Sequence, residues 1–223
     1  AGPTGMSLAW EIIRSSDHDV TVYDRKLSAG GSWWEPEVEV RDLHAHRIVF
    51  DRAFVNTRSL FSEMGISWDS VFIPMSDGVY EFMFRSLSVK DYGVLASLSA
   101  RVLSKPEKYK GISLKDAMGP LSEKGQGFIE HLPLIMDGVT WDVMSAYEFV
   151  KSFDHVATSK RYTQRGSGKV MCDAMEGALI DAGVNFVFGT ELKDVEYLED
   201  GYRATFFDDK VIDDGMLFLC LDN

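Results

Sequence analysis

Three shortages in the sequence limit what this protein can be. Two of its 223 residues are cysteines, Cys172 and Cys220. Neither belongs to a C-x-x-C pair, so a structural zinc or a redox motif is unsupported. No stretch approaches the ~18 consecutive apolar residues of a membrane span, and the first residues lack the basic-then-apolar pattern of a signal peptide. Lys and Arg number 23 against 35 Asp and Glu, a net charge of −12. This charge argues against a nucleic-acid partner, because phosphate binding relies on a basic surface.

The remaining composition is that of a globular protein able to bury a sizeable core. Hydrophobic residues make up 45% of the chain and charged residues 26%, both ordinary proportions. We interpret Cys172 and Cys220 as small apolar residues buried in a helix and a strand. Such cysteines fit a reducing compartment, so we expect a cytoplasmic protein without a membrane span. The oligomeric state is left open.

The spacing of apolar residues predicts the helices and strands of the first two thirds. A helix is expected over 4–14, a short strand over 20–23, and a helix over 55–65 that stops at its final glycine. From 86 to 147 the pattern is mainly helical, with Ser113 as the expected N-cap of a helix.

After Gly168 helices give way to strands. The expected elements are a helix over 169–183 and strands over 185–189, 192–199, 202–207 and 216–221. Strands alternating with helices at both ends of the chain, with a helical block between them, indicate an α/β domain interrupted by an insertion.

The opening stretch, AGPTGMSLAW, has the form of a dinucleotide-binding turn. In the fingerprint G-x-G-x-x-G, the glycines make a tight turn, let the backbone approach a diphosphate and allow close helix packing. Gly2 and Gly5 have the spacing of the second and third glycines. The first glycine and the strand before it are expected upstream of Ala1. A helix from Thr4 would direct its backbone N–H groups and positive dipole end at phosphates.

A second feature follows at the distance that this motif requires. Asp24 closes the segment VTVYD, about twenty residues after the turn, where an acidic residue accepts hydrogen bonds from ribose hydroxyls. Gly30 and Gly31 follow it in DRKLSAGGSW. With this spacing, the chain resembles the FAD-dependent amine oxidase and phytoene desaturase superfamily. The resemblance implies FAD as cofactor and a Rossmann-like FAD/NAD(P)-binding domain with a mostly helical insertion.

The resemblance also implies which residues bind FAD. In that family the acidic residue holds the adenosine ribose, and a later Thr-x-Val meets the adenine through its backbone; Thr190 and Leu192 take those places here. The implied cofactor-binding residues are Gly2, Pro3, Gly5, Asp24, Arg25, Gly30, Gly31, Ser32 and Leu192.

One position departs from the family pattern. Many members have Arg directly after the glycine pair, near the diphosphate, where this chain has Ser32. Either Arg41 or Arg47 supplies that positive charge, or the phosphate contacts rely on backbone donors. Of the pair His44 and His46, the first is a candidate for lining the flavin site, whereas no further ligands are recognisable that would make the pair a metal site.

The implied function is flavin-dependent oxidation, in which a hydride passes from a small-molecule substrate C–H to FAD. No catalytic residue is identified, because the cofactor carries the chemistry. Two alternatives remain open: a non-redox flavoprotein of the galactopyranose mutase type, and a degenerate Rossmann binding module. The expected division is a first FAD-domain part over 1–54, lacking its first strand, a helical insertion over 55–154 that belongs to the substrate domain, and a truncated second part over 155–223. We expect the chain to be a piece of a longer oxidase.

Overall fold

A computed structural model describes residues 1–31, 33, 49–52, 54–75 and 85–220. The chain divides into two compact units. The first unit consists of Ala1–Pro74 and Arg161–Asn223, and the second of Met75–Lys160. The helix expected at 55–65 lies in the first unit, where Phe61 is part of the core, rather than in the insertion over 55–154.

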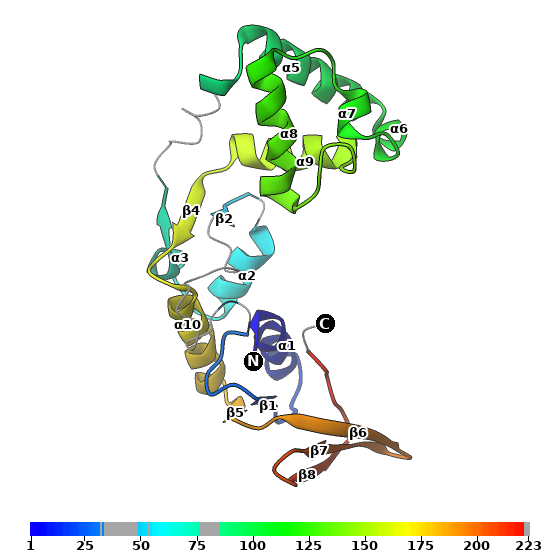
Figure 1. The fold of residues 1–223 in the computed structure, drawn as a ribbon. Coiled ribbons are helices and arrows are strands. Elements are labelled where there is room, and N and C mark those ends of the chain that lie inside the picture. Colours follow the sequence, from blue (N-terminus) through cyan, green and yellow to red (C-terminus); the bar gives the residue numbers. More distant parts are fainter. Residues whose placement is uncertain (32, 34–48, 53, 76–84, 221–223) are drawn as a thin grey trace. The chain divides into compact units, whose positions relative to one another are not determined.

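A pair of parallel strands anchors the first unit (Figure 1). β1 (Thr21–Asp24) pairs with β5 (Asn185–Phe188), so that Asp24 is opposite Phe188. Each strand follows a helix, α1 (Pro3–Ser15) before β1 and α10 (Gly168–Asp181) before β5. Parallel strands cannot be joined by a tight turn, so helix-then-strand connections are the expected solution. The helix and the strand predicted for each segment are confirmed.

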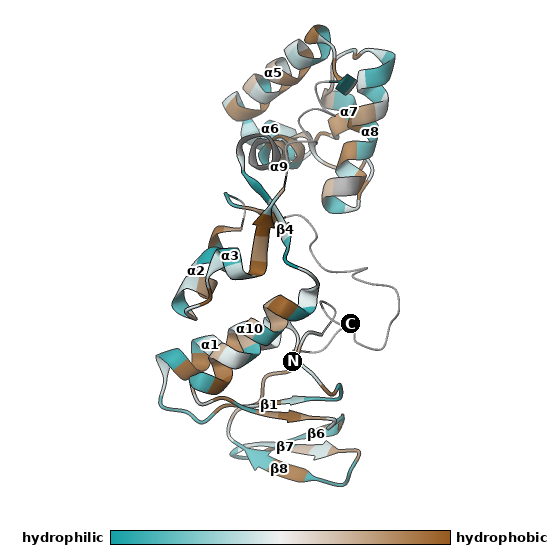
Figure 2. Ribbon diagram, turned by 90° about the vertical axis from the view of Figure 1, so that its left-hand side faces the viewer, coloured by the Kyte–Doolittle hydropathy of each residue, from teal (hydrophilic) through white to brown (hydrophobic). Residues whose placement is uncertain are grey.

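The apolar sides of α1 and α10 build the core beside this strand pair. Met6 and Ala9 of α1 are buried in one cluster with Met171, Cys172 and Leu179 of α10. Figure 2 shows the matching pattern, with apolar and polar residues alternating around both helices. Burying the apolar stripe of each helix against the other removes it from water, which is the main stabilising contribution to such packing.

A second, antiparallel sheet belongs to the same unit. β4 (Arg161–Gln164) lies between β2 (Val49–Phe50) and β3 (Phe72–Pro74). α2 (Val55–Glu63) and α3 (Trp68–Val71) lie between β2 and β3 in the sequence. Aromatic side chains of these helices pack on the sheet: Phe61 of α2 stacks on Phe72 of β3, and Trp68 of α3 meets Tyr162 of β4 edge to face. None of these three strands was predicted, because strands of two to four residues carry little periodicity.

The last sheet is a three-stranded meander formed by β6 (Leu192–Leu198), β7 (Gly201–Phe206) and β8 (Val211–Asp214). The strands predicted at 192–199 and 202–207 are confirmed. The strand predicted at 216–221 is wrong for the described residues 216–220, which have no regular structure. A strand needs a hydrogen-bonded neighbour; β8 finds one in β7, whereas residues 216–220 run to the side of α1, with Cys220 next to Gly5.

The second unit is helical, as the sequence predicted for 86–147. Its described helices are α5 (Val89–Ser104), α6 (Pro106–Lys110), α7 (Leu114–Ala117), α8 (Glu123–Asp137) and α9 (Ala146–Thr158). Leu98, Ile129 and Phe149 are fully buried in their common core. Ser113 caps α7 as expected, accepting a hydrogen bond from the backbone of Asp116.

One buried carboxylate joins the first turns of two of these helices. Asp91 of α5 accepts hydrogen bonds at 2.7–2.8 Å from the backbone N–H and hydroxyl of both Ser88 and Ser122, the N-cap residues of α5 and α8. Burial acts to raise the pKa of Asp91, but these hydrogen bonds outweigh it and hold the pKa well below its usual range. A Cβ on Gly125 would lie 2.6 Å from the carboxyl carbon, so glycine is needed there.

Candidate functional site

The first turn of α1 is built as the motif predicts. Gly2 is the N-cap in an extended conformation and Pro3 is the first helical residue, where its missing N–H is not needed. The Gly2 carbonyl accepts the first helical bond, from Met6 at 3.0 Å. Helix geometry leaves the N–H groups of Thr4 and Gly5 without an intrahelical acceptor. The first turn holds no acidic residue, so its positive dipole end is unopposed from within the helix.

The glycine pair packs directly on this turn. Gly31 adopts φ = +54°, and a Cβ built on it would lie 2.7 Å from the Cα of Gly2. Gly30 donates its N–H to the carbonyl of Ala1 at 2.8 Å. Both the left-handed conformation and the close backbone contact require a residue without a side chain at Gly31. The structure therefore brings Gly2, Pro3, Gly30 and Gly31 together in one backbone cradle.

Asp24 lies at the end of β1, beside this cradle. Its Oδ1 accepts the backbone N–H of Lys26 at 2.8 Å, and its Oδ2 contacts the backbone nitrogen of Ala1. The carboxylate is 14% exposed. Two carboxylate oxygens offer about four acceptor sites, so Asp24 keeps the capacity to accept hydrogen bonds from ligand hydroxyls.

The remaining predicted residues lie at the margin of the cradle. The backbone of Thr190 donates to the carbonyl of Asp24 at 3.0 Å, which brings the start of β6 and Leu192 next to the end of β1. Arg25 is exposed, with its Nη1 3.7 Å from Glu191 Oε1, so it points along the surface toward that carboxylate. Gly5 is the third residue of α1, in its first turn, and packs against Cys220.

Several predicted residues lie outside the described residues. These are Ser32, Arg41, Arg47, His44 and His46. Among the residues that the structure describes, no group of three or more His, Cys, Asp or Glu side chains could hold a metal ion. The helices of the described ranges are each too short or too polar to cross a bilayer.

Two contacts of the site were not anticipated from the sequence. Lys26 donates from Nζ to the carbonyl of Gly31 at 3.0 Å. Trp33 places its carbonyl oxygen so close to the start of α10 that a Cβ on Gly168 would collide with it. The first contact lies within one loop, whereas the second joins segments that are far apart in the sequence. The available signals were a lysine shortly after the strand-end carboxylate and a glycine at a helix start.

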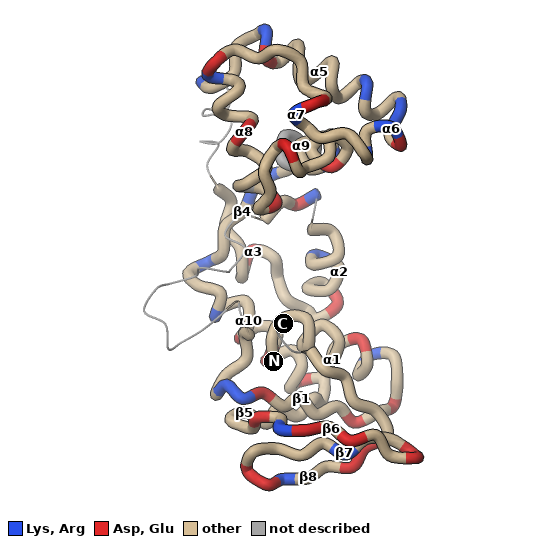
Figure 3. The backbone as a smooth tube through the Cα atoms, turned by 45° about the vertical axis from the view of Figure 1, so that its right-hand side comes forward, with Lys and Arg blue, Asp and Glu red and all other residues tan. Residues whose placement is uncertain are grey.

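The charge distribution distinguishes the first turn of α1 from the meander β6–β7–β8. Figure 3 shows acidic residues along the meander β6–β7–β8. They include Glu191, Asp194, Glu196, Asp208, Asp209, Asp213 and Asp214. Acidic side chains repel a diphosphate, whereas the first turn of α1 offers N–H groups. An anionic ligand is therefore better accommodated at α1 than on the meander.

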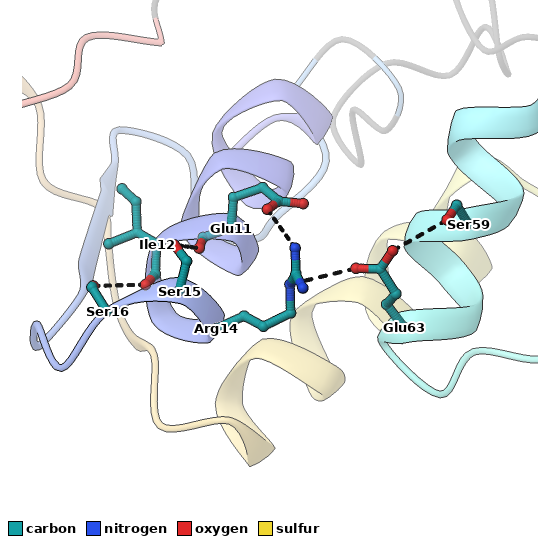
Figure 4. A network of polar contacts seen from close by, with 7 residues as sticks. All are labelled: Glu11, Ile12, Arg14, Ser15, Ser16, Ser59 and Glu63. Carbon is teal, nitrogen blue, oxygen red and sulfur yellow. Dashed lines mark hydrogen bonds and ion pairs between the residues drawn. The ribbon is translucent and has the colours of Figure 1, made fainter.

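The far end of α1 is connected to α2 by a surface network (Figure 4). Arg14 lies between two carboxylates, with Nη2 2.8 Å from Glu11 and Nε 3.4 Å from Glu63. Ser59 donates to the other oxygen of Glu63 at 3.1 Å. These side chains are about half exposed, so each ion pair contributes little to stability. The network joins the last turns of α1 and α2, at the opposite end of α1 from the cradle.

The mixed helix-and-strand fold is shared with solved structures that include an oxidoreductase. An oxidoreductase from Methanosarcina mazei aligns with a TM-score of 0.68 at 17% identity, over 97% of this chain and 56% of that one. A protein from Pyrococcus furiosus aligns with a TM-score of 0.68 at 16% identity, over 96% of this chain and 55% of that one. No family model matches the chain, and no curated protein matches its sequence.

Putrescine oxidase is also among the solved structures with this fold. Putrescine oxidase bound to putrescine aligns with a TM-score of 0.55 at 17% identity, over 95% of this chain and 54% of that one. The chain thus spans a little over half the length of the structures that it matches. These alignments show that the chain shares its fold with an oxidoreductase and with putrescine oxidase, as the resemblance seen in the sequence implied.

Proposed function

We propose that this chain is the adenosine-binding part of a flavin-dependent oxidoreductase of the amine oxidase or desaturase type. The observation that carries the proposal is the meeting of the first turn of α1, the glycine pair and Asp24 at one place. The structural likeness to oxidoreductases supports it.

The described residues fit an FAD adenylate. The diphosphate would rest against the N–H groups of Thr4 and Gly5, which have no acceptor within α1. Asp24 would accept hydrogen bonds from the ribose hydroxyls, and Leu192 would offer its backbone to the adenine. Bound FAD would supply the redox chemistry by accepting a hydride from a substrate C–H bond. The chain's own contribution is to bind and orient the cofactor.

The test compares two substitutions at Gly5 in the full-length polypeptide. A Cβ at this position would lie 3.5 Å from the Cβ of Cys220, which is an ordinary contact. Gly5→Ala is therefore expected to bind FAD like the wild type, whereas the branched side chain of Gly5→Val is expected to press on the neighbouring segment and abolish binding. Flavin occupancy is measured from the visible absorbance of protein dialysed against FAD.

The same measurement separates the alternatives. A wild-type protein that acquires no flavin absorbance would contradict the proposal and favour a degenerate binding module. A protein that binds FAD but whose flavin is not reduced by any amine or desaturase substrate would favour a non-redox flavoprotein. Flavin occupancy in Gly5→Val equal to that of the wild type would contradict the assignment of the first turn of α1 as the binding place.

A further inference from the structure

Lys26 makes hydrogen bonds to three segments around the cradle. Its backbone N–H donates to Asp24 Oδ1 at 2.8 Å, and its Nζ donates to the carbonyl of Gly31 at 3.0 Å. Its carbonyl accepts the N–H of Gly189, after β5, at 3.0 Å. One residue thus connects the strand-end carboxylate, the glycine loop and the end of the neighbouring strand.

The hydrogen bond from the Lys26 ammonium group to the Gly31 carbonyl has a charged donor. A charged donor to a carbonyl oxygen contributes more than a neutral pair, and Lys26 is half-buried, which reduces competition from water. The residue that it reaches, Gly31, is in a left-handed conformation and in backbone contact with Gly2. A loop in that arrangement needs external bonds to remain in one conformation.

We propose that Lys26 is a positioning residue that fixes the glycine loop against α1, and the Asp24 carboxylate beside it, before any cofactor binds. This inference rests on the proposed function, since the arrangement that Lys26 maintains is the one assigned to FAD. The ligand is an adenine dinucleotide, and Lys26 acts on it through Gly31 and Asp24. Preorganisation of this kind improves affinity by lowering the ordering cost of binding.

Two substitutions separate the side chain's role from that of the backbone. Lys26→Met keeps the aliphatic length and the backbone bonds to Asp24 and Gly189 but removes the donor to Gly31. Lys26→Arg restores a charged donor of similar reach. Lys90→Met, at an exposed position of α5 in the second unit, is the matched control for loss of a lysine charge.

The first measurement is hydrogen exchange of the full-length polypeptide without cofactor. Lys26→Met is expected to raise the exchange rate of the Gly30 amide, which bonds to Ala1, by about fivefold or more. Lys26→Arg and Lys90→Met should exchange like the wild type. The second measurement is FAD affinity, which should fall about five- to thirtyfold in Lys26→Met and stay within about threefold of wild type in Lys26→Arg.

The outcomes are distinguishable. Unchanged exchange in Lys26→Met would overturn the inference even if FAD affinity falls, because the lysine would then act by touching the ligand. Faster exchange with undiminished affinity would also overturn it, because loop order would then be irrelevant to binding. Absence of FAD binding by the wild type would overturn the proposed function, and the inference with it.

Discussion

Gly31 and Gly2 meet backbone to backbone: a Cβ on Gly31 would lie 2.7 Å from the Cα of Gly2. This contact fixes the separation between the glycine loop and the first turn of α1, two segments that are far apart in the sequence. It also places the left-handed residue of the loop where a side chain has no space.

The contact predicts a large effect of Gly31→Ala. Alanine at φ = +54° is strained by about 1 kcal/mol or more, and its methyl group would push the loop away from Gly2. We expect the free energy of unfolding to fall by about 2 kcal/mol, measured by urea denaturation, and FAD affinity to fall with it. The control is Gly177→Ala within α10, where a Cβ would meet no atom of the described chain within 4 Å. That change should stabilise the protein by about 0.5–1 kcal/mol; equal effects of the two substitutions would contradict the account.

Asp91 predicts an acid-dependent contribution to the stability of the helical unit. Asp91→Asn replaces the buried carboxylate that accepts bonds from Ser88 and Ser122 and should lower the free energy of unfolding by about 3 kcal/mol at pH 7. Folding lowers the pKa of Asp91, so the ionised carboxylate stabilises the folded state. This contribution to the free energy of unfolding is fully present above the unfolded-state pKa of ~3.9 and is lost as the pH falls below that value. The difference between wild type and Asp91→Asn should therefore narrow below about pH 4.

The free energy of unfolding is measured by urea denaturation at several pH values from neutral to acidic, with the circular dichroism signal of the helices as the probe. Asp116→Asn is the control, since this exposed residue at the third position of α7 also follows a capping serine, Ser113. It should change stability by less than about 0.5 kcal/mol. A pH-independent difference for Asp91→Asn would show that the carboxylate charge is not what the two serines stabilise.

The two thiols should differ sharply in reactivity. Burial raises the pKa of Cys172 to about 12, so almost no thiolate forms at neutral pH. Cys220 is exposed beside α1, contrary to the buried strand position expected for it, because residues 216–220 are not paired in a sheet. A thiol reagent should modify one group per native chain rapidly, and none in Cys220→Ser. Rapid modification of two groups in the native protein would mean that the α1–α10 core is open.

Local signals predicted most of the first unit. The apolar stripe of α1, the strand ending at Asp24 and the helix ending before Gly183 each have a clear period or stop signal, and all three are confirmed. The family resemblance implied that Gly2 and Gly31 belong to one site, and the structure brings the two into contact. Such features depend on a few neighbouring residues, which a sequence shows directly.

Other features depend on partners that the sequence does not display. The run MLFLCL is more apolar than VIDD, yet VIDD forms β8 because β7 offers it hydrogen bonds. Lys26 could not be assigned a bond to Gly31, since the sequence does not show that the loop turns the Gly31 carbonyl toward the ammonium group. The apolar pattern therefore identified candidate strands, and tertiary pairing decided among them.

The central claim is that Asp24 binds the ribose of a dinucleotide whose diphosphate rests on α1. Its most direct test is a titration of the full-length polypeptide with FAD and with riboflavin, comparing wild type, Asp24→Ala and the exposed-loop control Asp19→Ala. We predict that wild type and Asp19→Ala bind FAD alike and much more tightly than riboflavin, and that Asp24→Ala binds FAD at least about tenfold more weakly. Unchanged FAD affinity in Asp24→Ala would contradict the account.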